Sequence, residues 1–342
     1  MFPSENQVAG CLIGQCVGDA VGFVVEGAAA SVCRPYADAV LLRGEIPGTR
    51  RGGFPFGQFS DDSQLARELV LSLMAYQPFD PADYGARIRD LFTTGRIVGG
   101  GRATAEAAAR LASGVPWNES GTPPPNAGNG SAMRAGPVGL VCFNDPDRLI
   151  GLACDQGRIT HADPRCSAGA VAVAGAVALA MTEGPLDVPA VAATLATWAN
   201  RVDRRVGDAI AELPGIVAMS PADALPAIQA IVAADFDDGE AAGGVSPFVT
   251  TSVLWSLYAF LRTPDTYRQC LHTAVAVGGD VDTTAAMAGA MAGARVGLDG
   301  IPRPLAERIE DRGEWRLDRW RDLAGRLWRR CVAPVTGAQL RD

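Results

Sequence analysis

Two short acidic clusters, far apart in the sequence, hold the residues best suited to chemistry. The first is Ser60-Asp61-Asp62-Ser63, and the second is Gly279-Asp280-Val281-Asp282-Thr283-Thr284. Each joins two carboxylates to at least one hydroxyl, and such hard oxygen ligands suit Mg²⁺ or Mn²⁺ better than zinc or copper. Four carboxylates can share a small volume only if cations neutralise them or some take up protons. If the fold brings the two clusters together, a two-metal centre is the simplest explanation.

Each cluster also has a plainer interpretation, because acidic residues often cap helix N-termini and oppose the helix dipole. The presence of two such clusters, each leading into an apolar helical segment, favours the metal-site interpretation. The second cluster also resembles the Asp-x-Asp-x-Thr nucleophile motif of haloacid-dehalogenase-type phosphatases. That motif usually opens such a chain, whereas here it begins at Asp280, and the lysine that these phosphatases normally use is absent.

Three further segments contain candidate ligand-binding residues. Residues 128–134 (GNGSAMR) follow a proline-rich loop, and their glycines would let the backbone approach a phosphate closely. His161, just before an apolar segment, could donate a hydrogen bond to a phosphate or ribose oxygen. Glu26 follows an apolar stretch, in which a glutamate can have a raised pKa and exchange protons near neutral pH. Taken singly, each also has a plainer interpretation, as a simple turn, a capped helix start with a hydrogen-bonded histidine, and a surface glutamate.

The composition excludes several classes of function. The chain has 342 residues, and all 30 basic residues are arginine, so a lysine Schiff-base enzyme and a Walker P-loop are excluded. The net charge of −8 argues against general nucleic-acid binding. No apolar run reaches the roughly 18 residues that span a bilayer, so no membrane association is expected. Eight scattered cysteines and an N-terminus without a basic segment predict a cytoplasmic location.

Helical periodicity dominates the sequence, and strand-like alternation is rare. Residues 64–76 repeat apolar side chains at helical spacing, and residues 308–331 predict an amphipathic terminal helix that Gly313 could interrupt. Because no long or low-complexity linker divides the chain, we predict one all-α domain over residues 1–342. Three segments are small and apolar nearly all round, which is typical of buried, close-packed helices: 167–181, 251–261 and 283–296.

Taken together, five segments resemble the ADP-ribosylglycohydrolase family. This family includes ADP-ribosylarginine and ADP-ribosylserine hydrolases and the glycohydrolase that reactivates dinitrogenase reductase. With their flanking helices the segments cover residues 10–297, and the ordered set is far more specific than any one of them. In chain order they are Gly18-Asp19-Ala20-Val21-Gly22 with Glu26, the first acidic cluster, residues 128–134, Thr160-His161-Ala162-Asp163-Pro164, and residues 278–283.

The resemblance implies a compact, orthogonal all-α fold around a dinuclear centre of two Mg²⁺ ions, with Mn²⁺ as an alternative. It implies catalytic roles for Glu26 and Asp62, and the division of acid and base roles between them stays open. The family usually has threonine at the positions of Ser60 and Val281; Ser60 keeps the hydroxyl, and Val281 need not face the metals. The implied metal ligands are Ser60, Asp61, Asp62, Asp280, Asp282 and Thr283.

The implied reaction is hydrolysis of the C1″ glycosidic bond of ADP-ribose. Its substrate would be an ADP-ribosylated protein or a small molecule that contains ADP-ribose, with the linkage left open. Because protein and diphosphate are both anionic, attraction would come from the metals, backbone N–H groups and Arg134. The residues implied to hold the diphosphate and riboses are Gly128, Asn129, Gly130, Ser131, Met133 and His161.

Two alternative functions remain from the sequence. A Mg²⁺-dependent phosphatase of the haloacid-dehalogenase type would form an aspartyl-phosphate at Asp280 and release phosphate. A non-catalytic protein on the same scaffold would bind ADP-ribose without turnover. The complete set of carboxylates argues against the second alternative, since decayed sites tend to lose ligands.

Overall fold

The computed structural model describes residues 2–48, 51–233 and 244–332. Within these ranges every regular element is a helix, and strand-type pairing is limited to isolated bridges. This confirms the all-α prediction. None of the described helices has the length and apolar character needed to cross a membrane. The single domain over residues 1–342 stays a prediction, and part of it lies outside the described ranges.

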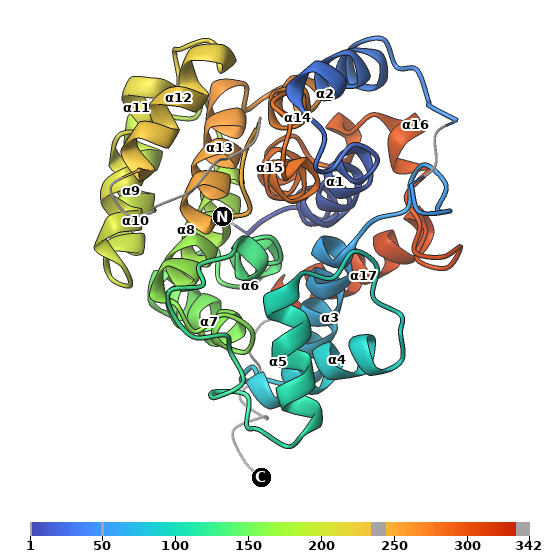
Figure 1. Ribbon diagram of the computed structural model, residues 1–342, viewed down its shortest axis with the longest axis vertical. Coiled ribbons are helices and arrows are strands. Elements are labelled where there is room, and N and C mark those ends of the chain that lie inside the picture. The colour runs from blue at the N-terminus through green and yellow to red at the C-terminus, as the bar shows by residue number, and fades with distance from the viewer. Residues whose placement is uncertain (1, 49–50, 234–243, 333–342) are drawn as a thin grey trace.

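Seventeen α-helices are described, together with a π-helical turn and two 3₁₀ turns (Figure 1). The α-helices are α1 (Glu5–Phe23), α2 (Ala30–Ala37), α3 (Asp61–Ala75), α4 (Pro81–Thr93), α5 (Arg102–Ala112), α6 (Gly136–Val141), α7 (Pro146–Arg158), α8 (Pro164–Ala180), α9 (Val188–Asn200), α10 (Arg204–Ala211), α11 (Leu213–Ile216), α12 (Pro221–Val232), α13 (Val249–Arg262), α14 (Tyr267–Ala276), α15 (Val281–Val296), α16 (Arg303–Ala306) and α17 (Leu317–Val332). The shorter turns are η1 (Asp38–Leu42), η2 (Asn129–Ser131) and η3 (Leu298–Gly300).

Local sequence signals set the start of many helices. At four of them an Asp or Ser side chain accepts a hydrogen bond from a backbone N–H in the first turn, and a proline follows at the first helical position. The cap supplies a partner for an otherwise unpaired N–H, and proline has no N–H to lose there. These starts are Asp80-Pro81, Asp145-Pro146, Asp163-Pro164 and Ser220-Pro221.

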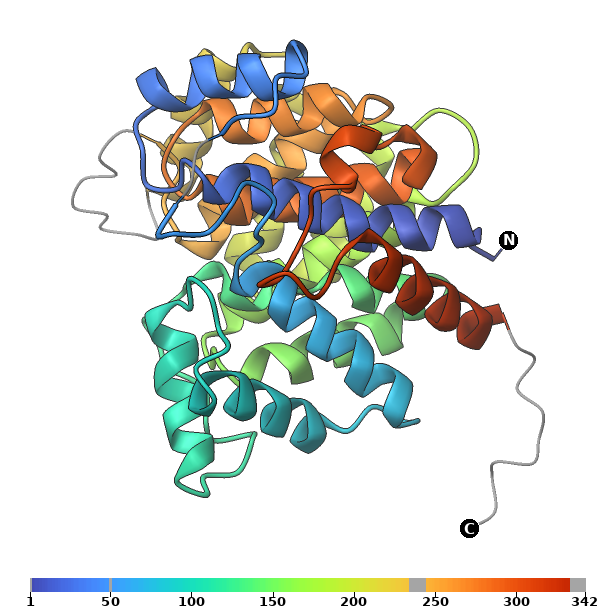
Figure 2. The ribbon, with the colours of Figure 1, turned by 90° about the vertical axis from the view of Figure 1, so that its right-hand side faces the viewer.

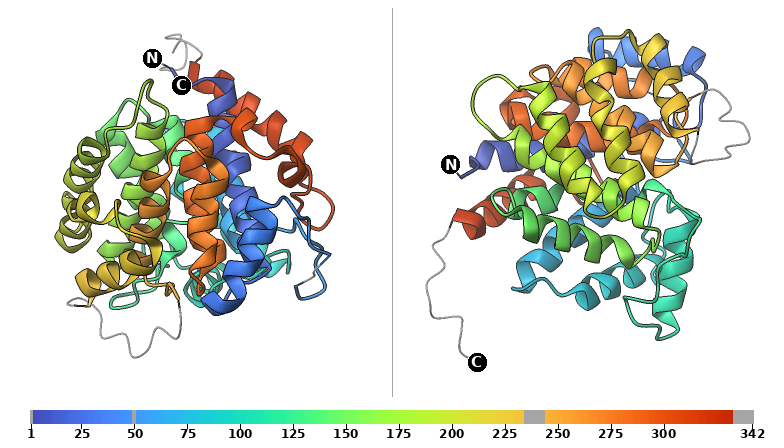
Figure 3. Two further views of the ribbon diagram at one scale, coloured as in Figure 1. Left: turned by 90° about the horizontal axis from the view of Figure 1, so that it is seen from above. Right: turned by 90° about the vertical axis from the view of Figure 1, so that its left-hand side faces the viewer.

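Helix α15 lies at the centre of the molecule, with α1 beside it and α8, α13 and α14 also in contact (Figure 1). Helices α3 to α5 lie below this pair, and α17 runs beside α1 (Figure 2). Helices α9 to α12 form an outer layer over α8 and α13 (Figure 3). The first turn of α15, which carries the second acidic cluster, is therefore surrounded by other elements.

A glycine at every fourth position of α1 lets its backbone touch that of α15. A Cβ added at any of these glycines would lie 2.0 to 2.4 Å from a backbone atom of α15. The close approach places the end of α1, and the segment after it, against the first turn of α15. The four positions are Gly10, Gly14, Gly18 and Gly22.

Four of the helices predicted by periodicity are confirmed as α3, α8, α13 and α15. The helix predicted over residues 308–331 is confirmed only from Leu317, where α17 begins, and the interruption predicted at Gly313 lies before it. The chain turns before that helix at Arg312 and Gly313, whose φ values are +51° and +83°. Such left-handed conformations end a helix rather than continue it.

A buried ionic cluster ties this C-terminal turn to α3. The Asp311 carboxylate accepts hydrogen bonds from Arg67 Nη1 (2.8 Å) and Gln64 Nε2 (3.0 Å), and the Arg67 side chain is only 4% exposed.

Replacing Asp311 with alanine should lower the free energy of unfolding by about 3 kcal/mol, because it removes a partner from a buried guanidinium. Urea denaturation would measure the change. Glu314→Ala is the matched control, since the exposed Glu314–Arg319 pair should contribute nothing measurable; equal losses in both variants would contradict the prediction.

Candidate active site

A cleft of about 840 Å³ opens at the N-terminal ends of α3 and α15. One side, which we call the acidic end, carries the carboxylates of both acidic clusters together with Glu26: Glu26, Asp61, Asp62, Asp280 and Asp282. The structure thus brings the two clusters into one cleft, the condition on which the two-metal interpretation depends. The rest of the lining comes from four separate segments: Thr104, Pro125, Asn126, Gly128, Asn129, Gly130, Met133, His161, Arg165 and Phe248.

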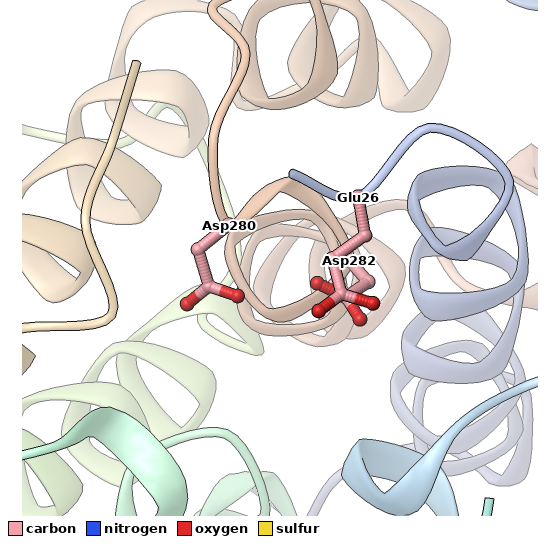
Figure 4. A group of neighbouring side chains, drawn as sticks. All are labelled: Glu26, Asp280 and Asp282. Carbon is pink, nitrogen blue, oxygen red and sulfur yellow. The ribbon is translucent and has the colours of Figure 1, made fainter. Parts of the chain in front are cut away.

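Three carboxylates of the acidic end are closely grouped. Glu26, Asp280 and Asp282 each offer an oxygen, and these oxygens lie within 4.8 Å of one another. Figure 4 shows that the two aspartates come from the start of α15, that Glu26 follows α1, and that all three carboxylates point into a common space. Hard oxygens at this spacing fit one divalent cation or more.

The first turn of α3 orients Asp62. Ser60 is the N-cap of this helix, and its hydroxyl donates to Asp62 Oδ2 (2.8 Å). Asp62 Oδ1 is buried and has no hydrogen-bond partner among the described residues. A buried carboxylate oxygen without a partner is costly unless a cation or a proton supplies one. A divalent cation, which the oxygen ligands of the site imply, would give Asp62 Oδ1 this partner.

Burial and the mutual repulsion of the carboxylates disfavour their ionised forms at the acidic end. Burial, followed by the charge of Asp19, raises the pKa of Asp61 to about 7, and burial raises the pKa of Asp280 to about 6. Burial and neighbouring carboxylates raise the pKa values of Asp62 and Asp282 well above the usual range. At neutral pH the whole group can be ionised only when cations compensate the charge.

Asp19 organises the first acidic cluster, a role that sequence reasoning missed. It lies fully buried in α1 and accepts hydrogen bonds from Ser60 N (2.8 Å), Ser63 N (3.0 Å) and Ser63 Oγ (2.7 Å). These contacts fix the start of α3, from which Asp61 and Asp62 project. The available signal was a lone aspartate inside an otherwise apolar helix.

The glycine segment before α6 supports the second acidic cluster as well as the cleft wall. Asn129 Nδ2 donates to Asp280 Oδ2 (2.6 Å) and to Ser252 Oγ (3.1 Å), so this side chain orients Asp280. Gly130 is required by close packing, because a Cβ there would lie 2.6 Å from His161 Cε1. The Ser131 hydroxyl donates to a buried carbonyl of α8.

His161 presents one ring nitrogen to the cleft as a donor. Its Nδ1 lies 2.8 Å from Thr160 Oγ1, which accepts a hydrogen bond from Arg134 Nη2 (2.8 Å). Because arginine only donates, the Thr160 hydroxyl can give its proton to Nδ1, and this arrangement leaves the ring proton on Nε2. Burial and the Arg134 charge lower the pKa of His161 to about 3, so the ring is neutral.

The expectation that Arg134 contacts a diphosphate is wrong. This side chain is fully buried, lies over the Tyr84 ring (5.5 Å) and donates to Gln156 Oε1 (2.8 Å). The arginines that line the cleft are Arg102 and Arg165 instead. The surroundings of Glu26 also differ from the apolar ones expected. Its Oε2 pairs with Arg51 Nη2 at 2.8 Å, and about a third of each side chain is exposed.

Comparison with known proteins assigns the chain to a family. The model of the ADP-ribosylglycohydrolase family matches residues 3–335. The chain belongs to this family. It is 27% identical to the ADP-ribosylhydrolase ARH3 of Mus musculus, covering 90% of this chain and 88% of the relative. It is 26% identical to the ADP-ribosyl-[dinitrogen reductase] glycohydrolase of Rhodospirillum rubrum, and this match covers 92% of this chain and 94% of the relative.

A solved structure entitled "ADP-ribosylglycohydrolase-related protein complex" matches with a TM-score of 0.71. Sequence identity is 26%, and the match covers 95% of this chain and 98% of that one. The resemblance seen in the sequence is therefore confirmed, and the fold agrees with the ADP-ribosylglycohydrolase family.

Most of the residues that the resemblance singled out line the cleft of this family member. Thr283 is among them, and its backbone N–H donates to Asp282 Oδ1 (2.9 Å). Ser60 and Ser131 are the exceptions. Both are fully buried, both hydroxyls are engaged by neighbouring groups, and neither belongs to the cleft wall.

The neutral state of His161 predicts a specific dependence of stability on pH. An unfolded histidine titrates near 6.5, so between pH 6.5 and about 3 the unfolded chain binds a proton that the folded protein does not. Stability is therefore present above pH 6.5 and lost on acidification. From pH 7 to pH 5 the free energy of unfolding of His161→Gln should fall by about 2 kcal/mol less than that of the wild type. Urea denaturation at both pH values would measure this, and equal falls would contradict it.

Proposed function

We propose that this protein is a divalent-cation-dependent hydrolase of the C1″ glycosidic bond of ADP-ribose. The substrate would be an ADP-ribosylated protein side chain or an ADP-ribose derivative, and ADP-ribose would be released. The observation that carries the proposal is the convergence of five carboxylates from three separate segments in one cleft. The names of the two relatives, an ADP-ribosylhydrolase and an ADP-ribosyl glycohydrolase, agree with this activity.

Asp61, Asp62, Asp280, Asp282 and the Thr283 hydroxyl would hold the metal, with Asp62 Oδ1 gaining the partner that it lacks. We propose two Mg²⁺ ions, with Mn²⁺ as an alternative, since five carboxylates carry more charge than one divalent ion compensates. When bound, such ions supply Lewis acidity and a template that orients oxygen atoms. Ser60 would act indirectly, because its hydroxyl holds Asp62.

The rest of the cleft lining would hold the remainder of the substrate. The neutral His161 donates from Nε2, and the backbone of the glycine segment lies beside it. Arg165 is fixed by Asp163 Oδ2 (2.8 Å) and by the Pro125 carbonyl (3.0 Å), and its guanidinium lies 5.3 Å from the Phe248 ring centre. A ligand that carries an anionic diphosphate between two sugars matches a cleft with an acidic metal-binding end and a donor-rich end.

We assign proton transfer at the glycosidic bond to Glu26 rather than Asp62. The Glu26 carboxylate is about one third exposed, whereas Asp62 is only 1% exposed. A group that takes a proton and returns it in each turnover needs exchange with solvent. Asp62 would then act only as a ligand and as electrostatic stabilisation for the positive charge that develops on the sugar.

Product analysis separates this proposal from its alternatives. The purified protein is incubated with an ADP-ribosylated peptide and Mg²⁺, and the products are resolved by chromatography. Free ADP-ribose together with unmodified peptide is the expected result. A phosphatase would leave this substrate intact, because ADP-ribose has no terminal phosphate, and would release inorganic phosphate from a phosphomonoester offered in parallel; the family match gives no support for this alternative. Absence of any product, with ADP-ribose still bound in calorimetry, would support the binding-only alternative.

A further inference from the structure

Arg51 fixes a positive charge against the carboxylate that we assign to proton transfer. Its Nη2 lies 2.8 Å from Glu26 Oε2, while Nη1 donates to the carbonyls of Phe23 (2.6 Å) and Glu26 (3.3 Å). The guanidinium also lies over the Phe23 ring, 4.9 Å from its centre. The end of α1 therefore holds this side chain through several contacts at once, and the charge has a defined position.

A second arginine packs on the aromatic ring next to Phe23. Phe54 forms backbone hydrogen bonds in both directions with Arg51, and its ring lies 6.3 Å from that of Phe23. The Arg312 guanidinium lies 5.8 Å from the centre of the Phe54 ring. Two guanidinium groups thus flank the Phe23–Phe54 pair, and one of them, that of Arg51, contacts the acidic end through Glu26.

We propose that Arg51 makes the site select substrates whose ADP-ribose is attached to a neutral, hydroxyl-type acceptor rather than to a guanidinium. The inference rests on the proposed function. If Glu26 moves the proton of the glycosidic bond, the acceptor attached to C1″ must lie next to Glu26, and so next to Arg51. A guanidinium acceptor would meet a like charge there and would compete with Arg51 for the same carboxylate. A hydroxyl-type acceptor carries no charge and meets neither obstacle.

The charge mechanism predicts an effect that a purely structural role would not produce. Arg51→Gln removes the cation, so relative cleavage of the arginine linkage should rise. We expect the arginine-to-serine ratio of kcat/KM to increase about tenfold, which corresponds to about 1.4 kcal/mol. In the wild type the same ratio should rise with salt, because salt screens repulsion between partly exposed charges. In Arg51→Gln the ratio should be insensitive to salt.

The test uses two peptides of one sequence that carry ADP-ribose on serine or on arginine. Initial rates of ADP-ribose release are measured for the wild type, Arg51→Gln and Arg51→Lys. Arg51→Lys keeps the charge and should keep the wild-type ratio. Arg43→Gln is the matched control, because Arg43 pairs with Glu45 nearby in the chain, away from Glu26, and should also keep the wild-type ratio. The change of ratio between variants is decisive, because the intrinsic reactivities of the two bonds cancel.

A tenfold rise confined to Arg51→Gln, with the salt response lost, would support the inference. An equal fall in both rates would overturn it and would leave Arg51 as a support for Glu26. A wild type that prefers the arginine linkage at low salt would also overturn it. These results leave the glycohydrolase proposal standing, whereas a wild type that releases ADP-ribose from neither peptide would overturn both.

Discussion

Replacing Asp282 with asparagine should lower kcat for ADP-ribose release by about a thousandfold, near the upper range for loss of one preorganised electrostatic group. Asparagine has the same shape but cannot carry the charge that a divalent cation requires. Asp282 lies in the first turn of α15, 4% exposed, and shares the grouped oxygens with Glu26 and Asp280. Single-turnover rates with Mg²⁺ would give the effect on chemistry, and calorimetric titration with Mg²⁺ alone would show weakened binding.

The same variant should be more stable than the wild type when no metal is present. Burial and the neighbouring carboxylates raise the pKa of Asp282 above its unfolded value, so its ionisation disfavours the folded state increasingly as pH rises. Asparagine removes that penalty. Asp299→Asn, at an exposed position beyond the other end of α15, is the matched control and should change neither rate nor stability. An active Asp282→Asn enzyme would contradict the metal assignment.

A large loss of stability is also expected from Gly18→Ala. A Cβ at Gly18 would lie 2.0 Å from the Ala285 carbonyl oxygen and 2.6 Å from its carbon. Backbone atoms of a buried helix cannot move aside as a flexible side chain can, so α1 and α15 must separate. We expect the free energy of unfolding to fall by about 3 kcal/mol. Urea denaturation would measure the loss, and activity should fall with it because Asp19 is displaced.

Gly151→Ala provides the matched control for this substitution. Gly151 is also helical, in α7, but a Cβ there would meet no atom within 4 Å. Alanine favours helix over glycine by about 1 kcal/mol, so this variant should be slightly more stable than the wild type. Equal destabilisation by both variants would show that contact between α1 and α15 does not limit stability.

Features that depend on neighbours in the sequence were predictable. The small residues of α8 and α15 indicated buried helices, and their periodicity needed no tertiary information. The two acidic clusters could be recognised for a similar reason, because each contains its carboxylates and hydroxyls within a few neighbouring residues. Their convergence was an inference from resemblance, and the structure supports it, because Asp62 and Asp282 line the same cleft.

Features that depend on long-range contacts were not predictable. Asp19 is hydrogen-bonded to residues of the first cluster that follow it by 41 to 44 positions in the sequence. Asn129 is hydrogen-bonded to Asp280, which lies 151 positions later. No local pattern shows that the Ser131 hydroxyl points into α8 rather than into the cleft. Arg51 is one of the 30 arginines of the chain and lies in a turn-rich segment. Only the fold shows that its charge faces Glu26. The direction of a side chain, more than its identity, was what the sequence left open.

The most direct test of the central claim is to restore activity to metal-depleted protein. The protein is stripped with EDTA and dialysed, and ADP-ribose release from a modified peptide is followed as Mg²⁺ or Mn²⁺ is added back. We predict no release without metal, saturable recovery with either ion, and about two ions bound per chain by calorimetry. Full activity in stripped protein whose metal content is below one tenth of an ion per chain would contradict the account.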